Sequence, residues 1–235
     1  MTRSLYAMVL ALAVTFWAAA AWGALDFSLT GEHTYQVGSV AGHTIADYPD
    51  SGFAVAINFN DATVGEITDL KFTFTITGGW NGDIYAYLSH GSSLAILLNQ
   101  VGADSGNPDG YGTSGFQNIT LASSAVQDIH QVAAPTAAGG PYAADGRINS
   151  QDASRPNTLA AFNGVNPNGD WVLYFADLSP GSTSTLSSWS LEITAVPEPV
   201  TIALGIFSLL AFVLGVKRFL SRNFFGQKDP QAGRS

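Results

Sequence analysis

Histidine, serine and carboxylate side chains are present, but their spacing forms no catalytic motif. No histidine pair has the i, i+4 spacing of a zinc site on a helix, and no Gly-x-Ser-x-Gly sequence marks a nucleophile turn. The chain has no cysteine, which excludes thiol catalysis and cysteine-ligated zinc. We therefore predict a non-catalytic protein, and a hydrolase that assembles carboxylates from distant segments is the alternative. The histidines are His33, His43, His90 and His130.

The residues best suited to bind a metal ion lie in one glycine-rich loop, GADSGNPDGYG, at 102–112. Asp104, Asn107 and Asp109 carry the hard oxygen ligands that Ca²⁺ prefers. Their spacing is not that of an EF-hand, so a solvated acidic turn is the alternative. Calcium is the one cofactor that the sequence suggests.

The chain is acidic, with a net charge of −9 at pH 7. Residues 25–196 carry 16 acidic side chains against three basic ones, Lys71, Arg147 and Arg155. A domain with three scattered cations cannot neutralise a phosphate backbone. We therefore expect no nucleic-acid partner.

The N-terminal segment predicts export. Arg3 precedes an uncharged apolar run over 5–20, and Ala21-x-Gly23 fits the small-residue rule for signal peptidase. This pattern predicts a signal peptide over 1–23, with an uncleaved anchor helix as the alternative.

A second apolar run lies near the C-terminus. Residues 200–216 are uncharged, which corresponds to about 25 Å of helix. The run predicts a transmembrane helix over 200–216. Basic residues after the run place that side in the cytoplasm and the acidic domain outside. Residues 223–235 form a polar basic tail.

The segment 196–222 combines a Pro-Glu-Pro motif, an apolar helix and a basic pair. In this order the three elements resemble the PEP-CTERM sorting signal. The resemblance implies that an exosortase in the inner membrane of a Gram-negative bacterium recognises and processes the segment. Two prolines stop the helix from extending toward the domain, which leaves an extended backbone at the membrane surface. The family's tail usually stops soon after the basic residues, whereas this one continues to residue 235. The motif residues are Val196, Pro197, Glu198, Pro199, Lys217 and Arg218.

The segment between the two ends predicts strands throughout. LKFTFTIT at 70–77, DWVLYFAD at 170–177 and SSWSLEIT at 187–194 alternate large apolar with smaller or polar residues. Glycine-rich turns separate the candidate strands, and no convincing amphipathic helix is present. We therefore predict an all-β domain over 24–195, an antiparallel β-sandwich.

The part from about 53 to 195 resembles the P domain (P/Homo B) of subtilisin-like proprotein convertases. The resemblance implies a β-sandwich of jelly-roll type and places Trp171, Leu173, Trp189 and Leu191 in a structural core. In convertases the peptidase is a separate domain, for which this chain has no room. The matched positions of the closing half are Phe162, Gly164, Gly169, Trp171, Leu173, Asp177, Gly181, Leu186, Trp189 and Leu191.

These features together predict an exported, exosortase-sorted surface or matrix protein with a structural or adhesive role. The resemblance to sorted proteins suggests exopolysaccharide or an envelope protein as the partner. Tyr85, Tyr87 and Tyr174 stand on the rows predicted to face outward, so they are candidates for a binding face. The alternatives are a divergent hydrolase and an accessory domain for a separate peptidase.

Overall fold

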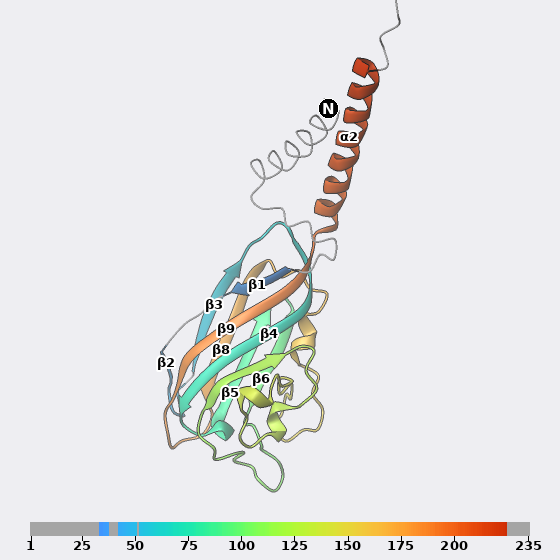
Figure 1. The fold of residues 1–235 in the computed structure, drawn as a ribbon. Helices are drawn as coiled ribbons and strands as arrows, with labels where there is room; N and C mark the ends of the chain where they lie inside the picture. Colours follow the sequence, from blue (N-terminus) through green and yellow to red (C-terminus); the bar gives the residue numbers. More distant parts are fainter. Residues whose placement is uncertain (1–32, 38–41, 51, 225–235) are drawn as a thin grey trace, which may run out of the picture. The chain divides into compact units, whose positions relative to one another are not determined.

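The computed structural model describes residues 33–37, 42–50 and 52–224 (Figure 1). The signal peptide predicted over 1–23 lies outside the described residues, as does the tail from 225. Four short 3-10 helices accompany the strands: η1 (Asn81–Asp83), η2 (Ile129–Gln131), η3 (Ala137–Gly139) and η4 (Leu159–Phe162). The strands are β1 (His33–Val37), β2 (His43–Ile45), β3 (Phe53–Phe59), β4 (Val64–Gly78), β5 (Ile84–His90), β6 (Ser93–Asn99), β7 (Phe116–Ala122), β8 (Gly169–Asp177) and β9 (Ser184–Pro197).

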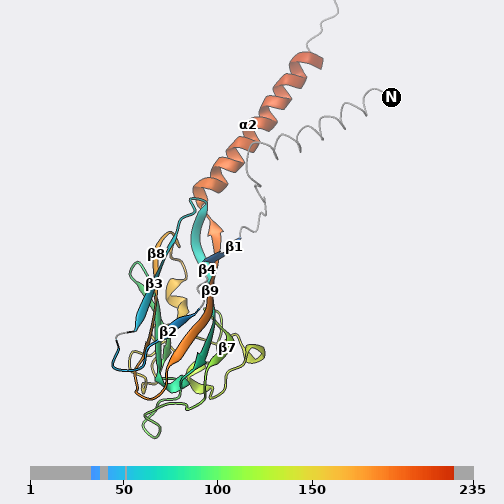
Figure 2. The same cartoon turned by 90° about the vertical axis from the view of Figure 1, so that its left-hand side faces the viewer.

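The strands form two antiparallel sheets, so the protein is mostly β as predicted. One sheet has the order β1-β9-β4-β7, with β2 also paired to β9, and the other has the order β3-β8-β5-β6. Figure 2 shows β3 and β8 to one side of β9 and β7. Apart from the hairpin of β5 and β6, neighbouring strands in each sheet come from distant parts of the chain, so the fold depends mainly on long-range pairing.

Inward-facing rows of both sheets join in one buried apolar cluster. Along β4 the burial alternates from Leu70 to Ile76, as period-two side chains require. The four residues expected in the structural core all lie in this cluster: Trp171, Leu173, Trp189 and Leu191. The Trp171 indole is fully buried, and its N–H donates to the Pro167 carbonyl at 2.8 Å.

The C-terminal segment forms one helix, α2 (Pro199–Phe224). A proline fits the first helical position, because the N–H that it lacks has no partner inside the helix. Large apolar side chains on all sides of α2 are more than half exposed: Leu204, Ile206, Phe207, Leu209, Leu210, Phe212, Val213 and Leu214.

Within the part of the chain that the structure describes, no helix has the length and hydropathy needed to cross a membrane. The transmembrane helix predicted over 200–216 is therefore not found there.

Candidate functional site

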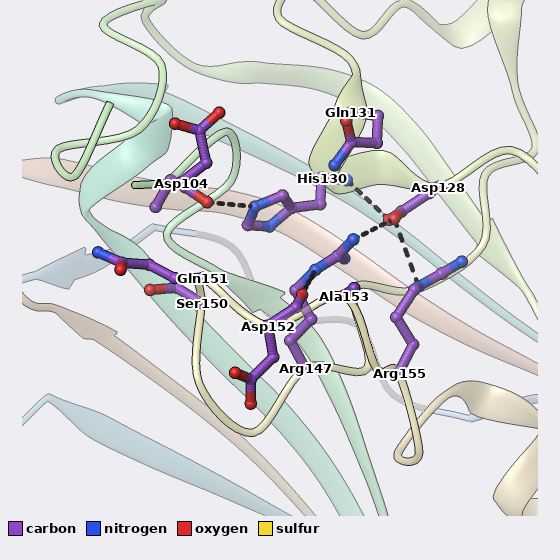
Figure 3. Close-up of a pocket in the computed structure, with 11 residues that line it drawn as sticks. Asp104, Asp128, His130, Gln131, Arg147, Ser150, Gln151, Asp152, Ala153 and Arg155 are labelled. Atoms are coloured by element: carbon purple, nitrogen blue, oxygen red, sulfur yellow. Dashed lines mark hydrogen bonds and ion pairs between the residues drawn. The ribbon is translucent and has the colours of Figure 1, made fainter. Parts of the chain in front are cut away.

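A pocket of about 350 Å³ lies where the segment after β7 meets the loop after β6 (Figure 3). The strands supply none of its lining; short turns and 3-10 helices do. Two of the domain's three basic residues, Arg147 and Arg155, line it together with five acidic or amide side chains and a histidine. The polar lining residues are Asp104, Asp128, His130, Gln131, Arg147, Ser150, Gln151, Asp152 and Arg155.

His130, which lines the pocket, pairs with the buried carboxylate of Asp145. His130 Nδ1 lies 2.7 Å from Asp145 Oδ2, and His130 Nε2 lies 3.0 Å from the Ala103 carbonyl. Asp145 is 0% exposed and also accepts the backbone N–H of Asn99. Asp128 begins η2 and accepts the backbone N–H of His130, which fixes the ring's position.

Both arginines of the pocket converge on Asp128, as Figure 3 shows. Arg147 Nη2 lies 2.7 Å from Asp128 Oδ2, and Arg155 Nε lies 3.4 Å from the same oxygen. Arg147 also pairs with Asp145 at 3.2 Å. Burial alone lowers the pKa of Arg147, but Asp128 and Asp145 outweigh it and hold the pKa above its usual range, so the guanidinium stays charged.

The pocket lacks the geometry of a hydrolytic triad. A general base needs a ring nitrogen directed at a nucleophile, whereas both nitrogens of His130 already contact protein oxygens. The nearby Ser150 hydroxyl contacts Gln100 Oε1 at 3.3 Å instead. His90 is engaged in the same way: its ring nitrogens lie 2.9 Å from the carbonyls of Asp170 and Asn166, and its ring stacks on Trp171. The ion pairs and hydrogen bonds of Asp128, His130, Asp145 and Arg147 hold the long segment after β7 against the sheets.

Sequence reasoning missed this ionic network. Asp128, His130, Asp145 and Arg147 stand at irregular spacings, because turns rather than a helix or strand bring them together. The available signal was compositional: two of the three cations between 25 and 196, Arg147 and Arg155, lie eight positions apart in an otherwise acidic domain.

The loop predicted to bind calcium is bonded mainly to itself. Asp104 Oδ1 accepts the backbone N–H groups of Gly106 and Asn107, at 2.7 and 2.8 Å. The Asn107 amide donates to the carbonyls of Gly102 and Gly110. Asp109 lies beside η1. Its backbone carbonyl oxygen is so close to Gly82 that a Cβ added to Gly82 would lie 2.3 Å from it. Two of the three predicted ligands, Asp104 and Asn107, thus make hydrogen bonds within their own turn.

The first part of the Pro-Glu-Pro motif is hydrogen-bonded to the sheet. Pro197 is the last residue of β9 and pairs with Val64 of β4. The Glu198 N–H donates to the Thr63 carbonyl at 2.9 Å, and its carboxylate accepts from Asn166 Nδ2 at 3.1 Å. The basic pair, Lys217 and Arg218, lies on α2 with exposed side chains.

The three tyrosines singled out in the sequence form one cluster across β5 and β8. Tyr87 and Tyr174 are register partners whose rings stack with centroids 4.9 Å apart and planes at 19°. Tyr85 contacts both rings edge-on, at 6.1 and 6.4 Å. All three side chains are partly exposed, on the face opposite Ala86 and Leu88 of the core. Burial, then the two neighbouring tyrosines, raises the pKa of Tyr85, so its hydroxyl stays protonated at neutral pH.

Comparison with known proteins gives only distant similarity. No protein-family model matches the chain, and no curated protein matches it in sequence. A serine protease of Aeromonas sobria is similar over 70% of this chain and 27% of its own, at 14% identity and a TM-score of 0.41. That serine protease in complex with the chaperone ORF2 gives 14% identity and a TM-score of 0.43 over the same shares. FlhE is similar over 71% of this chain and 98% of its own, at 10% identity and a TM-score of 0.39. The chain thus spans about a quarter of the protease chain's length.

Proposed function

We propose that this is an exported, non-catalytic protein of the cell surface or matrix. An exosortase sorts it, and it has a structural or adhesive role in an exopolysaccharide-rich envelope. Its two sheets form a P-domain-like β-sandwich of jelly-roll type, which presents a binding face to polysaccharide or to an envelope protein.

The tyrosine cluster, Tyr85, Tyr87 and Tyr174, carries the adhesive part of the proposal. Flat aromatic rings cover the apolar faces of sugar rings, while their hydroxyls hydrogen-bond at the edges. The cluster stands on two hydrogen-bonded strands, so its geometry is fixed before a ligand arrives, and little ordering entropy is lost on binding. The occupied nitrogens of His130 and His90 support a binding protein over a hydrolase.

Replacing Tyr87 by alanine should weaken binding to exopolysaccharide at least tenfold. Tyr87 contacts both Tyr85 and Tyr174, so its loss removes one stacking ring and a neighbour of the other two. A factor of ten in affinity corresponds to ~1.4 kcal/mol. Full-length protein would be titrated with exopolysaccharide purified from the native host, by isothermal calorimetry or affinity electrophoresis.

Tyr48→Ala is the matched control, because Tyr48 is 55% exposed and lies outside the cluster. It should bind as the wild type does. Equal binding by the Tyr87→Ala protein, with an unchanged melting temperature, would remove the tyrosine face from the proposal.

The attachment of the Pro-Glu-Pro motif supports the sorting part of the proposal. Sheet pairing ends at Pro197, and the next residue, Glu198, donates its backbone N–H to Thr63, the residue directly before β4. A cut at this point leaves every strand of the domain in place and removes α2. The acidic domain, the apolar helix and the basic pair are also ordered as export through an inner membrane requires.

Mass spectrometry of the protein from its native host should give a product that ends near 196–199 and lacks 200–235.

Replacing both Pro197 and Pro199 by alanine should abolish this processing, because a helix can then extend into the motif. Lys228→Gln, in the tail, should be processed normally and serves as the control. A surface-exposed product that keeps its intact C-terminus would mean that the segment is a permanent anchor.

A further inference from the structure

Four carboxylates lie near one another where β5 begins and β8 ends. Asp83 lies in η1, directly before β5, and Asp177 is the last residue of β8. Asp47 comes from the turn after β2, and both of its oxygens accept the Gly181 N–H at 3.1 Å. Asp109 comes from the loop after β6. Coulombic repulsion from the other three acts on Asp83.

Backbone bonds hold Asp83 and Asp177 beside each other. Asp177 is the register partner of Ile84, and the Leu178 N–H donates to the Asp83 carbonyl at 2.8 Å. Both carboxylates also bond the same residue: Asp177 Oδ1 accepts the Ser179 N–H at 3.1 Å, and the Ser179 side chain bonds Asp83. Sheet register therefore sets the separation of the two acids.

One oxygen of each acid is buried without a hydrogen-bond partner. Among the described residues, Asp83 Oδ2 and Asp177 Oδ2 make no such bond, although the residues are only 3% and 1% exposed. The ion pairs among the described residues of the domain are made by Glu192, Asp128 and Asp145 and not by these four carboxylates. A buried carboxylate oxygen without a partner carries a full desolvation cost, and native proteins seldom leave two together.

The electrostatics of the pair indicate a missing positive charge. Burial, then repulsion from Asp177, raises the pKa of Asp83 to about 6, and burial raises the pKa of Asp177 as well. At neutral pH the pair is thus two like charges in a poorly hydrated place. A cation between the two Oδ2 atoms would satisfy both oxygens and offset the repulsion.

We propose that Asp83 and Asp177 bind a divalent cation, Ca²⁺, at this end of the sheets. Carboxylate oxygens are the hard ligands that Ca²⁺ takes, and water supplies the positions that protein leaves open. Asp109 and Asp47 add negative charge around the ion. In the described part of the chain, no group of three or more His, Cys, Asp or Glu side chains is arranged to hold a metal, so the site depends on this buried pair.

This site differs from the loop that the sequence suggested. Asp104 and Asn107 are used within their own turn, whereas Asp109 is carried to η1 by the bond from the Gly82 N–H to the Tyr111 carbonyl, at 2.9 Å. One of the three predicted ligands therefore contributes charge to the proposed site, and the other two do not reach it.

The test is the melting temperature of full-length protein in CaCl₂ and in EDTA. With an affinity in the ~0.1–1 mM range of extracellular modules, 10 mM CaCl₂ should raise the melting temperature by about 3–8 °C. Asp83→Asn and Asp177→Asn should each abolish the rise. In EDTA, both variants should melt at or above the wild-type temperature, because each removes one of two repelling charges. If the two carboxylates had only a structural role, both variants would instead melt below the wild-type temperature in EDTA.

Asp104→Asn is the matched control and should keep the full calcium response. Calorimetric titration with CaCl₂ should give one ion per chain for the wild type and for Asp104→Asn. No calcium response in the wild type would overturn the proposal. A response lost in Asp104→Asn and kept in Asp83→Asn would assign the ion to the loop and would overturn it equally.

Discussion

Replacing Trp171 by alanine should lower the free energy of unfolding by about 3–5 kcal/mol, the range for large buried aromatic side chains. Trp171 is fully buried, stacks on His90 with centroids 4.3 Å apart, and packs against Phe162. Its loss leaves a cavity, removes the N–H bond to Pro167 and exposes one face of the buried His90 ring. Domains are typically stable by only about 5–15 kcal/mol, so this loss is a large fraction of the total and the variant should unfold at a clearly lower urea concentration.

Urea denaturation of full-length protein, followed by far-UV circular dichroism, measures this effect. Trp80→Ala is the matched control, because Trp80 is 45% exposed and packs on Gly181 rather than in the core. We expect it to cost less than about 1 kcal/mol. Equal losses in the two variants would contradict a core centred on Trp171.

The strands were predictable because their signal is local. Period-two alternation in 70–77, 170–177 and 187–194 reports which face of each strand is buried. Burial of one face is enough to determine which side chains point inward. The same alternation placed Tyr85, Tyr87 and Tyr174 outward. Their meeting in one cluster needed the register of β5 against β8, which the structure supplies.

The two charged sites were not predictable, for a different reason. His130 and Asp145 are separated by 15 positions and meet through irregular turns, whereas Asp83 and Asp177 are separated by 94 positions and meet through the register of β5 against β8. In the segment 123–158 the backbone bonds within short turns and to strand ends, as between Tyr142 and Thr120. Hydrophobic periodicity reports neither the polar contacts between turns nor which strands pair with one another.

For the Pro-Glu-Pro motif, the sequence pattern predicted the backbone conformation but not its contacts. Two prolines correctly indicate a non-helical backbone at 197, since proline cannot donate a backbone hydrogen bond. The pattern does not reveal that Pro197 pairs with Val64 or that Asn166 donates to Glu198. Those contacts join segments over 30 positions apart, and only the folded chain brings them together.

Replacing Asp145 by alanine should destabilise the protein by about 3–5 kcal/mol, as expected when one partner of a buried ion network is removed. The Asp145 carboxylate accepts from His130, from Arg147 and from the Asn99 backbone. Without it, the buried Arg147 keeps only Asp128 as a charged partner, and His130 Nδ1 faces an empty space.

The Asp145→Ala loss should persist in 1 M NaCl, because salt screens exposed charges far more than buried ones. Hydrogen exchange of full-length protein should show the loop 127–148 losing protection first. Asp152→Ala is the matched control: its side chain is exposed in the same pocket, and Arg147 bonds only its backbone carbonyl. We expect that variant to change stability by less than about 0.5 kcal/mol. A similarly small cost for Asp145→Ala, or one that disappears in salt, would mean that the pocket's ion pairs are surface contacts and that apolar packing alone holds the loop to the sheets.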